Sequence, residues 1–129
     1  QDDFVKLSHE IPTIRDEVNW EVPESINYDL IIKTLTFFSK DFDILIIDGH
    51  LIYACSALVE IIDVPFILKT TQATYKRRKS ADKRWGVVPE WYVDYIWEAF
   101  SEYGSRDINE PICIKTDYPN IDFVTELLP

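Results

Sequence analysis

Six basic side chains are crowded into residues 76–84 of a chain that is otherwise acidic. The basic residues of this window are Lys76, Arg77, Arg78, Lys79, Lys83 and Arg84, and Asp82 is its one acidic residue. The other residues carry 7 basic and 22 acidic side chains, and the 129-residue chain has a formal net charge of −10. One guanidinium group can bind two phosphate oxygens at once. This segment therefore predicts a site for a compact anion such as the phosphates of a nucleotide. The alternative is a solvated helix face that forms salt bridges with the acidic body.

A second candidate group is Asp48, which follows the apolar run of residues 42–47 and precedes Gly49. A short and nearly continuous apolar run is typical of a strand buried on both faces of a parallel sheet. In open α/β sheets, ligands bind at the carboxyl ends of the strands, where Asp48 would then lie. A carboxylate there can hold Mg²⁺ directly or through water. The alternative is that Asp48 only caps the next helix.

The elements that must position these residues alternate between strands and helices. The sequence predicts strands at residues 42–47, 65–68 and 112–114. Helices are predicted at residues 27–39 with Asn27 as N-cap, at 51–62, from about residue 71, at 89–103 before Gly104, and at 122–128. The opening to about residue 25 is predicted to be irregular. This alternation indicates an α/β layered fold with a parallel sheet.

Composition limits the classes of protein to which the chain can belong. With 47% hydrophobic and 14% aromatic residues, it has the material for the core of one ordinary domain. No run approaches the roughly 18–20 apolar residues of a membrane span, so we expect no membrane partner. A nucleic-acid partner is not expected either, because most of this acidic chain would repel a polyanion.

The cysteine and histidine residues show no metal-binding spacing. Cys55 and Cys113 lie far apart in apolar surroundings, and His9 and His50 are isolated from each other. We therefore expect two buried free thiols in a reducing compartment such as the cytoplasm, with no disulfide-linked partner and no zinc site.

Five stretches in order resemble the nicotinamide riboside kinase family, in the uridine-kinase-like branch of the P-loop kinases. They are residues 1–4 (Gln-Asp-Asp-Phe), 19–27, 45–49, 75–80 and, as a fifth, 89–97. The resemblance implies a P-loop NTPase-like parallel sheet flanked by helices, in a single domain over residues 1–129 with a lid at about 76–90. It also implies that ATP and Mg²⁺ are used to phosphorylate the 5′-hydroxyl of a pyridine nucleoside, so the expected partners are a small-molecule nucleoside and ATP.

The resemblance also implies roles for individual residues. Asp2 matches the catalytic base, which in this family lies near the metal. Asp2 and Asp48 are therefore both expected at the metal site. A base is needed because a sugar hydroxyl is a poor nucleophile until its proton can be accepted. Arg78 is the catalytic phosphate clamp. The implied substrate-binding residues are Asp2, Asp3, Phe4, Trp20, Glu21, Lys79 and Trp85, and the implied nucleotide-binding residues are Arg77, Arg78, Lys83 and Arg84. For Trp20 and Trp85 the alternative is ordinary packing, and for Asp2 and Asp3 it is solvation near a chain end.

The chain departs from the family pattern in several places. Glu21 and Lys79 stand where the family tends to have Asp and Arg, and Asp82 stands where a lid Arg is expected. The three glycines, Gly49, Gly86 and Gly104, form no G-x-x-x-x-G-K-[ST] loop. We therefore expect an incomplete fold that lacks the first strand and the Walker A loop, and no kinase activity from these 129 residues alone. A uridine/cytidine or other nucleoside kinase, and a non-catalytic nucleotide-binding or interaction relative, remain alternatives.

Overall fold

The described residues form a mixed α/β fold with two small sheets and four α-helices. The computed structural model describes residues 1–82, 84, 86–106, 108 and 110–116. Strands β3 (Phe66–Lys69) and β4 (Ile112–Lys115) pair in parallel, in a register that joins Phe66 to Ile112. Strands β1 (Thr13–Ile14) and β2 (Glu17–Val18) form an antiparallel hairpin, whose two turn residues, Arg15 and Asp16, have positive φ values as tight hairpin turns require. The strands predicted at residues 65–68 and 112–114, and the parallel sheet expected from them, are confirmed, and the two strands pair directly.

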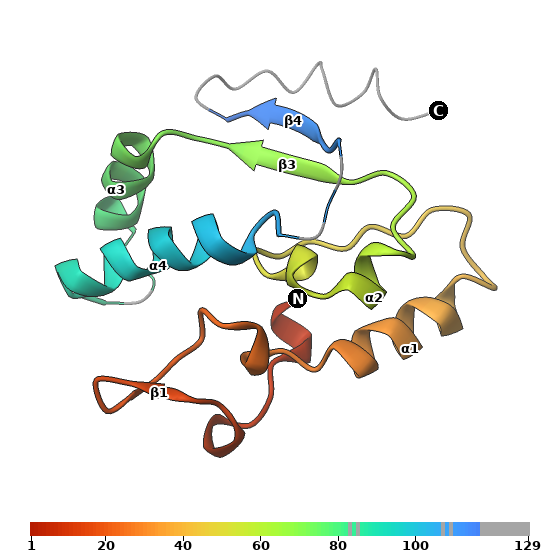
Figure 1. The fold of residues 1–129 in the computed structure, drawn as a ribbon, viewed down its shortest axis with the longest axis horizontal. Helices are drawn as coiled ribbons and strands as arrows, with labels where there is room; N and C mark the ends of the chain where they lie inside the picture. Colours follow the sequence, from red (N-terminus) through yellow and green to blue (C-terminus); the bar gives the residue numbers. More distant parts are fainter. Residues whose placement is uncertain (83, 85, 107, 109, 117–129) are drawn as a thin grey trace.

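The helices begin and end at residues that the sequence marks. Helix α1 (Tyr28–Phe38) is capped by Asn27, whose side chain accepts a hydrogen bond from the backbone N–H of Leu30. Helix α3 (Gln72–Ala81) connects β3 to α4 (Glu90–Tyr103), and α4 runs alongside β3 (Figure 1). After α4 ends, a Cβ on Gly104 would lie 2.5 Å from the ring of Phe100, so close packing requires glycine there.

The prediction of a strand at residues 42–47 is wrong, because this segment forms no strand. Ile44 is 58% exposed and Ile46 is 83% exposed. A strand buried on both faces of a sheet needs a hydrogen-bonded neighbour, and within the described residues β3 pairs only with β4. Residues 42–46 are therefore exposed, whereas Ile47 packs against the core. The Phe42 ring meets Phe38 edge to face, and Phe38 meets Phe37 in the same way.

Of two other predicted helices, one is replaced by shorter elements and one lies outside the described residues. The segment predicted as a helix over residues 51–62 forms a 3-10 turn (Ile52–Ala54) and the single-turn helix α2 (Ser56–Val59). The helix expected at residues 122–128 lies outside the described residues. The opening, expected to be irregular, also holds three 3-10 turns, at Asp2–Phe4, Ser8–Glu10 and Pro23–Ser25.

The main core joins α1 to the segment around α2. Its buried side chains are Ile26, Ile31, Leu51, Ile52 and Leu58, and Phe4 packs against them from the first 3-10 turn. Tyr28 on α1 donates a hydrogen bond of 2.8 Å to the carbonyl of Leu51, which fixes the helix to the loop after Gly49. The core thus lies directly behind the segments that hold Asp2 and Asp48.

The cysteines are free, as expected, but only one is shielded from solvent. Cys55 is half-buried beside the core, whereas Cys113 is exposed on β4, so the expectation of two buried thiols is wrong for Cys113. The segment on each side of Cys113 is apolar, but the side chains of a strand alternate between its faces. No helix among the described residues is long and apolar enough to span a membrane.

Replacing a core residue should cost far more stability than replacing its exposed neighbour. Ile31 is 1% exposed and Leu30 is 46% exposed on the same helix. We expect Ile31→Ala to lower the free energy of unfolding by about 2–5 kcal/mol and Leu30→Ala to change it by about 1 kcal/mol or less. Urea unfolding followed by circular dichroism measures both. Equal losses would contradict the core described here.

Stability should also fall in alkaline solution. Burial raises the pKa of Tyr28 above its usual range, and nearby Cys55 and Glu24 add to the shift. The folded state therefore keeps this proton to a higher pH than the unfolded state, so the stabilisation is complete below about pH 10 and is lost as the pH rises further. We expect urea unfolding to show a smaller loss between pH 8 and pH 11 for Tyr28→Phe than for the parent chain. An equal loss in both would show that Tyr28 does not contribute.

Candidate functional site

The first residue joins the segment that holds Asp2 to the segment that holds Asp48. The amino group of Gln1 donates to the carbonyl oxygen of Asp48 at 2.9 Å, and the Oε1 atom of Gln1 accepts from the backbone N–H of Leu51 at 2.9 Å. A Cβ on Gly49 would overlap the Gln1 side chain, so this approach requires glycine. Two stretches almost 50 residues apart in the sequence therefore lie side by side.

The carboxylates of Asp2, Asp3 and Asp48 are exposed on these two segments. Carboxylate oxygens are the donors that Mg²⁺ prefers, and Mg²⁺ commonly uses one or two of them together with water and substrate phosphates. Asp2 and Asp48 fit that donor set, with the remaining positions left to other ligands. Within the described residues, no group of three or more His, Cys, Asp or Glu side chains could hold a metal by itself.

Glu21 is buried between this region and α4. The residue is 9% exposed, its Oε1 atom accepts a hydrogen bond of 3.1 Å from the hydroxyl of Tyr92, and its Oε2 atom lies 3.1 Å from Nε2 of His50. His50 in turn lies beside Gln1, with Nδ1 3.5 Å from the amide nitrogen. A continuous set of contacts thus runs from the first residue through His50 and Glu21 to α4.

The segment around Glu21 is held at a second point on α4. The side chain of Asn19 donates to the hydroxyl of Tyr95 at 2.7 Å, and its Oδ1 atom accepts from the backbone N–H of Glu21 at 3.2 Å. Tyr92 and Tyr95 are three residues apart and so lie on one face of the helix. Trp20, between the two anchored residues, is 42% exposed and leaves an aromatic surface open to solvent.

Tyrosine hydroxyls around Glu21 keep their protons well above neutral pH. Burial raises the pKa of Tyr92 above its usual range, and the charge and hydrogen bond of Glu21 add to the shift. Burial and the carboxylates of Glu21 and Asp94 raise the pKa of Tyr75 to about 12. These side chains therefore act as neutral hydroxyl groups beside Glu21.

The basic side chains of residues 76–84 contact several different partners. Arg78 donates to the carbonyl of Thr116 at 2.7 Å and to its hydroxyl at 3.3 Å, which puts Arg78 at the carboxyl end of β4. Lys76 forms an ion pair with Asp94 on α4. The hydrogen bonds of Arg78 thus go to the sheet and not to the region of Asp2 and Asp48.

Arg84 is held by the acidic residue of its own segment. Its Nε and Nη2 atoms donate to the two carboxylate oxygens of Asp82, at 2.9 and 2.6 Å. This hydrogen bonding lowers the pKa of Asp82 to about 2. In this arrangement the guanidinium that the sequence assigns to a nucleotide is paired with Asp82. Arg77 is exposed and Lys79 is half-buried on α3. Lys83 and Trp85 lie outside the described residues.

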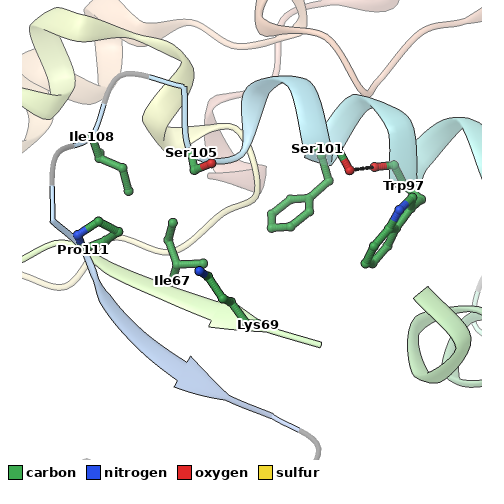
Figure 2. A pocket seen from close by; sticks show the side chains of 8 residues that line it. Ile67, Lys69, Trp97, Ser101, Ser105, Ile108 and Pro111 are labelled. Atoms are coloured by element: carbon green, nitrogen blue, oxygen red, sulfur yellow. Dashed lines mark hydrogen bonds between the residues drawn. The ribbon is translucent and has the colours of Figure 1, made fainter. Parts of the chain in front are cut away.

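A cavity of about 280 Å³ lies away from all of these residues, between β3 and the second half of α4. Figure 2 shows Ile67 and Lys69 of β3 facing α4 across it, with Ile108 and Pro111 at its other end. Its other lining residues are Trp97, Phe100, Ser101 and Ser105. Its walls are mainly apolar, and no residue predicted for the functional site lines it. A hollow of about 250 Å³ lies between α3 and the start of α4, next to Lys76 and Asp94.

His50 and Tyr92 are two residues of this site that the sequence did not indicate. His50 was expected to be an isolated histidine, yet it contacts Glu21. Its position just after Asp48-Gly49 was the one signal in the sequence that could have placed it at the site. Tyr92 belongs to a stretch that resembles the kinase family, but nothing in its spacing pointed to a partner 71 residues away. Phe4, in contrast, packs against the core.

Comparison with known proteins found one distant relative. No family model matches the chain. The chain is similar to a nicotinamide riboside kinase of Schizosaccharomyces pombe, with 21% identity over an alignment of 146 positions, gaps included, that covers 78% of this chain. The match covers 64% of the length of that curated relative. This similarity indicates a kinase-like relationship.

Proposed function

We propose that the complete protein is an ATP-dependent kinase that phosphorylates the 5′-hydroxyl of nicotinamide riboside or a related nucleoside, and so feeds NAD synthesis. The observation that supports this most is the convergence of three motifs: Gln1 binds the loop of Asp48, and His50 of that loop contacts Glu21. The similarity to the fission-yeast kinase points to the same class of reaction. The proposed location is the cytoplasm, where free thiols such as Cys55 and Cys113 stay reduced.

The proposed roles follow from the chemistry of each group. The Asp2 carboxylate accepts the proton of the 5′-hydroxyl, which makes that oxygen a better nucleophile. Asp2 and Asp48 are the protein groups that would hold Mg²⁺, which neutralises charge on the phosphates when bound. Trp20 offers its exposed ring to the flat pyridinium, and the Glu21 carboxylate accepts hydrogen bonds from the ribose. Arg78 is the proposed phosphate clamp, a role that requires its guanidinium to exchange its present hydrogen bonds to Thr116 for the transferred group.

The phosphate loop and a neighbouring strand would come from a segment of the complete protein that is not part of these 129 residues. Residues 42–47 and the unpaired edge of β3 support this proposal. Exposed β-branched side chains such as Ile44 and Ile46 would be buried if a strand paired there. The resulting structure would be a P-loop NTPase-like sheet flanked by helices.

A non-catalytic, nucleotide-binding relative is the second candidate. The pairing of Arg84 with Asp82 favours it, because that guanidinium is not free to contact a phosphate in this arrangement. The two candidates differ in whether bound nucleoside and ATP are converted to products.

Removal of the Trp20 ring should weaken nucleoside binding. A ring stacked on a cationic base contributes about 1–2 kcal/mol when water is excluded, so we expect Trp20→Ala to raise the Kd for nicotinamide riboside roughly 5- to 30-fold. Isothermal titration calorimetry on the 129-residue chain measures this, with Leu30→Ala as a control on the exposed surface of α1. A Kd unchanged by Trp20→Ala would rule out stacking, and a lower Kd for uridine would favour a uridine/cytidine kinase.

Phosphoryl transfer should require Asp2 and the additional phosphate-binding segment. We expect no product from the 129 residues with ATP, Mg²⁺ and nicotinamide riboside, and turnover from a longer protein that contains a glycine-rich phosphate loop. In that protein, Asp2→Asn should lower kcat by roughly 100- to 10,000-fold because the hydroxyl loses its base, whereas Asp29→Asn on α1 should not. Phosphorus NMR detects the product. Turnover by the 129 residues alone would contradict the proposal of a missing segment, and binding without turnover in the longer protein would favour the non-catalytic candidate.

A further inference from the structure

Glu21 has acceptor capacity that its present partners do not use. An ionised carboxylate offers about four lone-pair positions. Among the described residues, the Tyr92 hydroxyl uses one on Oε1, and His50 Nε2 lies close enough to Oε2 to block a second without a hydrogen bond, so about two positions remain for a ligand. A ribose presents two neighbouring hydroxyl donors, on its 2′ and 3′ carbons. The number of unused acceptors on Glu21 therefore matches the number of donors on a ribonucleoside.

The hydrogen-bond network around Gln1 determines which nitrogen of His50 carries the proton. The backbone N–H of Leu51 donates to Gln1 Oε1, so the amide NH₂ is the part of Gln1 that faces His50 Nδ1. An amide nitrogen only donates, and Nδ1 must therefore accept. In the neutral ring the proton then lies on Nε2, the atom 3.1 Å from the Glu21 carboxylate.

The contact between His50 and Glu21 is electrostatic in the present arrangement. Nε2 is shielded from solvent but is not aligned with Oε2 for a hydrogen bond, so its N–H has no formal partner. A buried donor without a partner is costly, which favours any arrangement of Glu21 that aligns the two groups. Tyr92 already holds the other oxygen, so the carboxylate has a restricted set of orientations.

We propose that His50 and Tyr92 are positioning residues, which hold the Glu21 carboxylate in the orientation that accepts the two ribose hydroxyls. This inference rests on the proposed function and makes it more specific. It assigns the preference for ribonucleosides over deoxyribonucleosides to the Glu21 carboxylate and to the two residues that orient it, His50 and Tyr92. His50 also links this preference to the loop of Asp48, two residues away in sequence, so the sugar pocket and the proposed metal site share a support.

The test is a double-mutant cycle on nicotinamide riboside binding by the full chain. We expect Tyr92→Phe and His50→Leu each to raise the Kd about 3- to 10-fold, and His50→Gln, which retains an amide donor, to stay within about twofold of the parent. In a Glu21→Gln background the same Tyr92 and His50 changes should have little further effect, because the carboxylate that they position is gone. Equal losses in both backgrounds would overturn the proposal, since they would mean that the two residues act only through general packing.

Two further measurements distinguish a failure of this inference from a failure of the proposed function: binding of a 2′-deoxy analogue, and an NMR measurement that needs no ligand. The 2′-deoxy analogue of nicotinamide riboside should bind more weakly than the ribonucleoside to the parent chain, and the difference should shrink in Glu21→Gln. Nitrogen-15 NMR of the histidine rings, recorded at a pH where the His50 ring is neutral, should show its proton on Nε2 and not on Nδ1. If the chain binds no nucleoside, the proposed function fails, yet the NMR result still decides the network. A proton on Nδ1, or equal discrimination between the two sugars in both chains, would refute the positioning role.

Discussion

The close approach of Gln1 to the backbone of Gly49 is the contact on which the candidate site depends. It brings the exposed carboxylates of two distant segments to one side of the core, and the Gln1 amide orients His50 toward Glu21. Two hydrogen bonds hold this contact, from the Gln1 amino group to the Asp48 carbonyl and from the Leu51 backbone N–H to the Gln1 side chain, and the Gln1 side chain packs directly on Gly49. Any side chain at position 49 would overlap Gln1. Glycine at position 49 is therefore required for this tertiary contact.

Helix α4 has a comparable role on the other side of Glu21. Its polar aromatic face binds Glu21 and Asn19 through Tyr92 and Tyr95, while Val93 and Ala99 are buried and the second half of the helix borders the cavity beside β3. One helix thus supports both the candidate site and the small parallel sheet. The basic helix α3 is joined to this support by the ion pair of Lys76 with Asp94 and to β4 by Arg78. Helix α3 is accordingly anchored to α4 and to the end of β4.

Local signals in the sequence predicted the elements that depend on local interactions. Asn27, Thr71 and Pro89 marked the starts of three helices, because caps act within one turn. The strand pair β3 and β4 also followed from short apolar runs. The run at residues 42–47 has the same composition but forms no strand, because strand formation depends on a hydrogen-bonded neighbour that composition does not specify. The contacts of His50 and Tyr92 with Glu21 span 29 and 71 residues, and no periodic pattern encodes such pairs.

The open apolar run at residues 42–47 also has a consequence for how the chain behaves in solution. Among the described residues this exposed apolar stretch pairs with no strand, and with the exposed rings of Phe37 and Phe38 beside it, it is a template for pairing between molecules. At neutral pH the net charge of −10 keeps neighbouring molecules apart by mutual repulsion. That repulsion vanishes near the isoelectric point of about 4.5, where colloidal stability should be lowest. Mild acid or high salt should therefore promote self-association through this edge, while dilute, slightly alkaline buffer should keep the molecules dispersed.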